Sequence, residues 1–171
     1  MQNKQNTKKY KVGIIGNGFV GESTAYAFSP ITEIRIYDID PLRRSHSLEE
    51  VCECDFVFIA VPTPMKKDGS QDTSCIESVF TSVTPGPVYI IKSTILPGTT
   101  NNLIKNYKEL DIIFSPEFLT ERTAKLDMLT QARVVFGGKE DLCNRVADMY
   151  KQRFMKRHFI ITDPTTAEYI K

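Results

Sequence analysis

Hydrophobic residues along this chain gather in short runs that end at glycine, proline or acidic residues. Runs such as DFVFIAV (55–61) and VYII (88–91) are continuous and rich in β-branched and aromatic side chains. Continuous apolar runs of this length are typical of strands buried on both faces of a parallel sheet. The predicted strands cover residues 10–15, 33–37, 55–61, 88–91, 112–114, 134–136 and 159–161.

Between the strands, apolar residues recur at helical spacing. The clearest case is 139–154, where Leu142, Val146 and Met149 share one face and charged residues occupy the other. The predicted helices cover residues 19–28, 47–51, 73–83, 101–108, 139–154 and 164–171. Alternating strands and helices predict an α/β fold, a Rossmann-like doubly wound, mostly parallel sheet with helices on both faces. In such a fold the ligand lies at the carboxyl ends of the strands.

Length and charge narrow the class of protein. At 171 residues the chain has the size of one domain, expected over 10–171 after a disordered polar tail at 1–9. The 22 basic and 21 acidic side chains give a net charge of +1, which argues against a nucleic-acid partner. No apolar run is long enough to span a membrane and the first residues form no signal peptide, so we expect a cytoplasmic protein without a membrane partner.

The four cysteines and two histidines do not predict a metal site. A single residue separates Cys52 from Cys54, whereas zinc ligands are separated by about two to four. Neither Cys75 nor Cys143 has a neighbouring ligand at zinc spacing. Reduced thiols and no bound metal are the expectation.

The strongest chemical signal is the segment GNGFVG (Gly16–Gly21), which follows a predicted strand and opens a predicted helix. In this pattern Gly16 permits the tight turn, Gly18 lets a pyrophosphate approach the backbone, and Gly21 lets the helix pack on the strand. Free N–H groups at a helix start favour anionic phosphates. We expect this segment, with Phe19 and Val20, to bind a dinucleotide.

An acidic residue follows the second predicted strand. Asp38 lies 22 residues after Gly16, where a carboxylate can accept hydrogen bonds from both ribose hydroxyls of an adenosine. Its charge would repel a 2′-phosphate, so NAD is preferred over NADP. Arg43 either lies beside the adenine or ribose or is solvated. Alternatively, the acid caps a turn and has no ligand role.

Several further motifs occur in a fixed order. With GNGFVG, the segments IYDID (36–40), VPTP (61–64), KSTILPGTT (92–100), SPEFLTE (115–121) and AEYIK (167–171) resemble the UDP-glucose/GDP-mannose dehydrogenase family, in its N-terminal NAD-binding domain. These enzymes oxidise the C6 hydroxyl of a nucleotide sugar to a carboxylate in two hydride transfers to NAD. The resemblance implies NAD as cofactor and a nucleotide sugar, UDP-glucose first, as substrate.

The resemblance also implies roles for individual residues. Cofactor-lining positions are Val61, Pro62, Thr63, Ser93 and Thr94, with Thr94 also near the catalytic water. Glu117 resembles the carboxylate that works with that water, and Lys171 the lysine that stabilises the oxyanion at C6. The sugar nucleotide would contact Glu117, Phe118, Leu119, Glu121 and Lys171. The hydroxyls could instead cap backbone groups, Glu117 could be a helix-start acid, and Lys171 could be solvated.

The sequence also departs from the family. Ser115 and Arg122 stand where asparagine and glycine are usual, and the connection from Asp38 to Asp55 is shorter. No cysteine of the chain lies in the glycine-rich setting of the family's nucleophile, which is expected beyond Lys171. We therefore expect either the NAD-binding part of a 6-dehydrogenase, completed by a C-terminal half or second subunit, or a truncated non-catalytic module that binds NAD or a partner. Hydroxyacid or phosphogluconate dehydrogenases and methyltransferases are further alternatives with similar glycine motifs.

Overall fold

The computed structural model describes residues 10–171, so the predicted tail at 1–9 lies outside the described residues. A seven-stranded sheet runs through the centre in the order β2-β1-β3-β4-β5-β6-β7. The strands are β1 (Lys11–Ile15), β2 (Glu33–Tyr37), β3 (Phe56–Ile59), β4 (Val88–Ile91), β5 (Asp111–Phe114), β6 (Arg133–Gly137) and β7 (His158–Thr162). All neighbours pair in parallel except β5 and β6.

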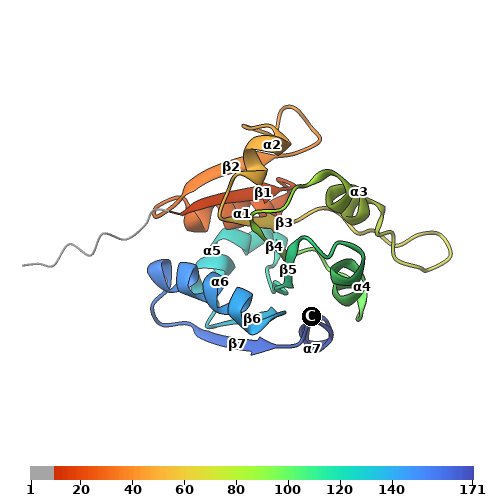
Figure 1. Ribbon diagram of the computed structural model, residues 1–171. Helices are drawn as coiled ribbons and strands as arrows, with labels where there is room; N and C mark the ends of the chain where they lie inside the picture. The colour runs from red at the N-terminus through yellow and green to blue at the C-terminus, as the bar shows by residue number, and fades with distance from the viewer. Residues whose placement is uncertain (1–9) are drawn as a thin grey trace, which may run out of the picture.

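Helices cover both faces of this sheet (Figure 1). The helices are α1 (Phe19–Phe28), α2 (Leu48–Cys52), α3 (Ser74–Ser82), α4 (Thr99–Asn106), α5 (Ala124–Thr130), α6 (Glu140–Arg153) and α7 (Pro164–Ile170), with a 3₁₀ turn η1 (Glu121–Thr123). Helices α1, α5 and α6 pack on one face, and α2, α3, α4 and α7 on the other. The doubly wound α/β fold expected from the sequence is thereby confirmed.

Burial on both faces explains the continuous apolar runs. Along β3, Phe56 and Phe58 face the layer of α1 and α6, whereas Val57 and Ile59 face the layer of α2 and α3. All four side chains are almost fully buried. A strand with helices on both sides cannot alternate apolar and polar residues, because each side chain enters a core.

Most element bounds agree with the sequence prediction to within one residue, but β3 ends at Ile59 rather than residue 61, and α4 and the segment 121–130 also differ. Helix α4 begins at Thr99 rather than residue 101, because the Glu168 carboxylate accepts from the N–H groups of Gly98 and Thr100 and so satisfies free donors of the first turn. The segment Glu121–Thr130 forms η1 and α5, for which no helix was predicted. Helix α5 is stabilised by packing on α1, with Met128 fully buried.

The strand order places the candidate residues at one edge. Strands β1 to β5 run parallel, so their carboxyl ends meet at the same edge of the sheet. The glycine segment, Asp38, the VPTP and KST segments and SPEFL all follow these strand ends. None of the described helices is long and apolar enough to cross a bilayer.

Candidate functional site

The glycine turn after β1 is tight on one side and open on the other. Gly16 adopts φ 90°, and its N–H donates to the Tyr37 carbonyl at 3.0 Å. A Cβ at Gly21 would lie 2.0 Å from the Gly16 oxygen, so only glycine permits this approach. A Cβ at Gly18 would meet no atom within 4 Å. The open space in front of Gly18, at the start of α1, is where a pyrophosphate would approach the backbone.

Asp38 lies beside this turn and is held by two backbone donors. Its Oδ2 accepts from the Asn17 N–H at 2.6 Å, and its Oδ1 accepts from the Asp40 N–H at 2.9 Å. The carboxylate is half-buried. Each oxygen keeps lone-pair capacity for a further donor, so the residues present fit the adenosine ribose of NAD.

Arg43 joins the site through its backbone. Its carbonyl accepts from Asn17 Nδ2 at 2.8 Å, which ties the loop after β2 to the glycine turn. Its guanidinium lies 3.6 Å from the Asp40 carboxylate and is 59% exposed. A hollow lined by Tyr37, Arg44 and His46 opens next to this loop.

The loops after β3 and β4 are bonded to each other. Thr63 Oγ1 donates to the Thr94 carbonyl at 2.6 Å, and Ser93 Oγ donates to the Val61 carbonyl at 2.7 Å. The hydroxyls of Thr63 and Ser93 therefore satisfy backbone groups. The same bonds hold the two loops together as one surface at the sheet edge. Pro62 lies in the first of these loops, between Val61 and Thr63.

Glu117 and Lys171 form a close, largely buried ion pair. Lys171 Nζ lies 2.7 Å from Glu117 Oε1 and also donates to the Glu117 carbonyl. Glu117 Oε2 accepts from the Leu119 N–H at 2.7 Å, and its side chain is only 8% exposed. The Lys171 ammonium also lies 5.8 Å from the centre of the Phe118 ring. The structure thus joins two predicted site residues that are 54 positions apart.

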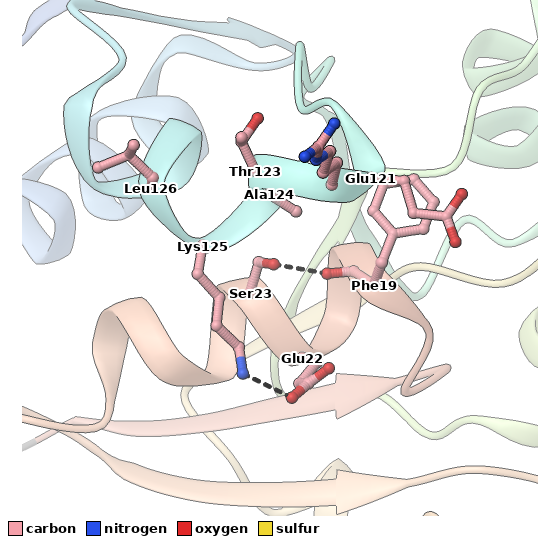
Figure 2. A pocket seen from close by; sticks show the side chains of 9 residues that line it. Phe19, Glu22, Ser23, Glu121, Thr123, Ala124, Lys125 and Leu126 are labelled. Atoms are coloured by element: carbon pink, nitrogen blue, oxygen red, sulfur yellow. Dashed lines mark hydrogen bonds and ion pairs between the residues drawn. The ribbon is translucent and has the colours of Figure 1, made fainter.

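The remaining predicted substrate-binding residue is Glu121, which lies beside the first turn of α1. Together with Phe19 and Glu22 of α1 it lines a hollow that continues along Thr123–Leu126 (Figure 2). Across this hollow, Lys125 Nζ pairs with Glu22 at 2.7 Å (Figure 2). Glu121 therefore faces the first turn of α1. Arg122 lines the same hollow.

Lys92 lies next to Pro116, although the sequence motif KSTILPGTT predicts no role for it. It follows β4, is fully buried, and donates to the Pro116 carbonyl at 3.3 Å. Burial lowers the pKa of Lys92 to about 8, while the charge of Glu117 acts in the opposite direction. A lysine directly after a fully apolar strand was the available signal for its burial.

Glu168 and Gln71 were also missed. Glu168 is 4% exposed and accepts from the Gly98 N–H at 2.5 Å and the Thr100 N–H at 2.7 Å. Gln71 bonds to the segment after β4 from a polar loop. No sequence pattern indicates either contact, because the partners are 23 or more residues away. Within residues 10–171, no cluster of three or more His, Cys, Asp or Glu side chains could hold a metal.

A glycine turn at a helix start, an acid after β2 and polar loops after β3 to β5 define a nucleotide-binding α/β domain. The family model for the UDP-glucose/GDP-mannose dehydrogenase family, NAD binding domain, matches residues 38–154. The chain belongs to this family and to its NAD-binding domain.

Curated relatives and solved structures agree with this assignment. The chain is 34% identical to a UDP-glucose 6-dehydrogenase of Rickettsia bellii over 72% of this chain and 31% of that protein. It is 28% identical to the UDP-glucose 6-dehydrogenase of Campylobacter jejuni over 94% of this chain and 50% of that protein. The structure of a UDP-glucose dehydrogenase from Pyrobaculum islandicum covers 99% of this chain at 25% identity and a TM-score of 0.87, with 50% of that chain covered. The chain thus spans at most about half the length of these relatives.

Proposed function

We propose that this chain is the NAD-binding half of a nucleotide-sugar 6-dehydrogenase of the UDP-glucose to UDP-glucuronate type. The observation that carries the proposal is the Glu117–Lys171 pair, 2.7 Å apart at the same sheet edge as the glycine turn and Asp38. An NAD-binding domain without this chemistry would need no buried carboxylate and ammonium at the edge of the sheet where the cofactor would bind.

The cofactor would be held by the residues at the carboxyl ends of β1 to β4. Gly16, Gly18 and Gly21 with the backbone of Phe19 and Val20 would receive the pyrophosphate. Asp38 would accept the ribose hydroxyls, and the loops carrying Val61, Pro62, Thr63, Ser93 and Thr94 would line the nicotinamide side. NAD, when bound there, supplies a hydride acceptor for the alcohol carbon of the substrate.

Glu117 and Lys171 supply complementary charges for the substrate. A carboxylate that positions or deprotonates water is required to hydrolyse an acyl intermediate, and a cation stabilises the alkoxide that forms at C6. Lys171 Nζ is held by two oxygens of Glu117, which fixes its position before substrate arrives. Phe118, Leu119 and Glu121 would contact the sugar nucleotide from the segment after β5.

The family resemblance implies a reaction step in which the sugar carbon is bound covalently to a cysteine thiol, and two of the buried cysteines of this chain are unsuited to that step. Burial raises the pKa of Cys54 to about 12 and that of Cys143 to about 11, so both remain protonated thiols at neutral pH. A protonated buried thiol is a poor nucleophile. Cys54 and Cys143 are therefore unsuited to act as the nucleophile, and the family resemblance implies that the thiol comes from a C-terminal half or a second subunit.

A thermal-shift comparison of NAD, NADP and S-adenosylmethionine tests the cofactor class. A ligand that binds only the native state raises the melting temperature. The proposal expects a rise with NAD and a smaller rise with NADP, because the Asp38 charge opposes a 2′-phosphate. A rise with S-adenosylmethionine alone would assign the fold to a methyltransferase instead.

A further inference from the structure

The loop between β3 and α3 carries a side chain that pairs with the backbone after β4. Gln71 Nε2 donates to the Thr94 carbonyl at 2.8 Å, and Gln71 Oε1 accepts from the Leu96 N–H at 3.1 Å. Thr63 Oγ1 donates to the same Thr94 carbonyl at 2.6 Å. The amide thus bonds this segment at two points, as a neighbouring strand would, and the Thr94 carbonyl accepts from two side chains.

The loop that presents Gln71 is itself closed by hydrogen bonds. Met65 and Gln71 form an antiparallel bridge, and the Lys66 N–H donates to the Ser70 carbonyl at 2.7 Å. Asp68 Oδ1 accepts from the Ser70 N–H at 3.0 Å and from its hydroxyl at 2.7 Å. This hairpin projects beside α3 in Figure 1, and its base, rather than its tip, faces the segment after β4. Gln71 is therefore presented by a defined turn.

The position of Thr94 gives this bracing its meaning. A dinucleotide crosses the carboxyl edge from the β2 side, where Asp38 lies, towards β3 and β4. Thr94 follows β4 and is exposed at this edge, on the side away from Asp38. The contacts of Gln71 thus fix the surface that the nicotinamide half would meet and leave the adenosine half untouched.

We propose that Gln71 is a positioning residue for the nicotinamide half of NAD, acting through the backbone of Thr94 and Leu96. This inference rests on the proposed function, since it requires that NAD binds at this edge. Gln71 does not contact the cofactor. It holds the segment after β4 in the orientation that the cofactor needs.

The test compares Gln71→Ala and Gln71→Glu with Gln152→Ala, which removes an exposed glutamine on α6. Calorimetric titration measures the Kd of NAD and of ADP, which carries only the adenosine side. Both variants lose the hydrogen bond that Gln71 Nε2 donates to the Thr94 carbonyl, and Gln71→Ala also loses the bond to the Leu96 N–H, so NAD binding is expected to weaken about fivefold to tenfold in both. ADP binding is expected to change less than about twofold, because it does not reach Thr94. The Gln152 variant is expected to match the wild type for both ligands.

Amide hydrogen exchange of Leu96 in the ligand-free chain provides a second readout. Gln71→Ala removes the acceptor of the Leu96 N–H, so exchange there is expected to accelerate. Gln71→Glu keeps an acceptor oxygen, so Leu96 protection is expected to persist even though the donor to Thr94 is lost. If Gln71 only stabilised the fold, the two variants would not differ in the exchange rate of Leu96 while showing the same loss of NAD affinity.

The outcomes separate this inference from the proposed function. If the wild type binds NAD but Gln71→Ala weakens NAD and ADP equally, or weakens neither, the positioning role is wrong and the proposed function stands. If the wild type binds ADP and NAD with equal affinity, the nicotinamide half contributes no binding free energy, and the positioning role is also wrong. If the wild type binds no NAD at all, the proposed function fails and the inference fails with it.

Discussion

At the residue scale, two glycines of the same turn have opposite surroundings. Gly21 is in contact with backbone, since a Cβ there would lie 2.0 Å from the Gly16 oxygen. Gly18 faces open space and has φ −75°, which any residue can adopt. Gly21 is thus required by packing within the protein. Gly18 has no such contact, so the lack of a side chain there affects only a ligand that approaches the turn.

This contrast predicts that Gly18→Ala and Gly21→Ala fail in different ways. Gly18→Ala is expected to change the free energy of unfolding by less than about 1 kcal/mol and to weaken NAD binding about tenfold or more, because its methyl group occupies the pyrophosphate space. Gly21→Ala is expected to destabilise the fold by about 1–3 kcal/mol through overpacking. Urea unfolding and calorimetric titration measure both quantities. Unchanged NAD affinity in Gly18→Ala would show that the pyrophosphate does not bind in front of Gly18.

The lowered pKa of the buried Lys92 predicts that the free energy of unfolding depends on pH. Burial lowers its pKa in the folded chain to about 8, against an ordinary value of 10.5. Between these values the unfolded chain binds more protons than the folded chain, so this residue makes stability rise with pH. From pH 8 to 9.5, wild type should gain about 1.5 kcal/mol of unfolding free energy relative to Lys92→Met.

The comparison with Lys92→Met isolates the lysine. Buried thiols and phenols titrate in both proteins, and their contributions cancel in the difference between the two urea unfolding curves. A difference that stays constant from pH 7 to 9.5 would show that Lys92 keeps its ordinary pKa in the folded chain.

At the element scale, α4 and α7 are joined by one buried carboxylate. Glu168 of α7 accepts two backbone N–H groups at the start of α4, and Asn101 Nδ2 donates to Thr165 Oγ1 at 2.9 Å. A carboxylate at a helix start satisfies free N–H donors and interacts favourably with the aligned peptide dipoles. Because α7 also carries the residue before Lys171, this contact sets where Lys171 meets Glu117.

Removing this carboxylate is expected to cost more than an ordinary surface change. Glu168→Ala should lower the free energy of unfolding by about 2–3 kcal/mol, because two charge-assisted bonds are lost and the Thr100 N–H stays buried without an acceptor while the Gly98 N–H stays partly buried. Glu109→Ala, at an exposed glutamate between α4 and β5, should change it by less than about 0.5 kcal/mol. Equal values for the two variants would mean that the bonds to α4 carry no net stability.

The same contact explains why the start of α4 escaped sequence analysis. Gly98 and Thr100 are bonded by a residue 68 to 70 positions away, which no local pattern contains. Helix α5 could not be predicted for a related reason. The burial of Met128 and the ion pair of Lys125 with Glu22 both depend on α1, which is distant in the sequence. By contrast, β3 and β4 were predictable because burial on both faces leaves an apolar run in the sequence.

At the scale of the whole molecule, the sequence predicted the sheet and the residues of its carboxyl edge but not their pairings. Motif order carried the family, which the match over residues 38–154 confirms. Hydrophobic patterns do not give strand direction, so the antiparallel step between β5 and β6 could not be read from them. The ion pair of Glu117 and Lys171 likewise depends on the return of the chain to β5 after 54 residues.

The whole sheet edge supports one central claim, which is that residues 10–171 bind NAD across the ends of β2, β1, β3 and β4. Isothermal titration of the chain with NAD tests this claim most directly. We predict saturable binding of one NAD per chain that weakens about tenfold or more in Gly18→Ala. Absence of binding heat at millimolar NAD, with the chain folded, would contradict it.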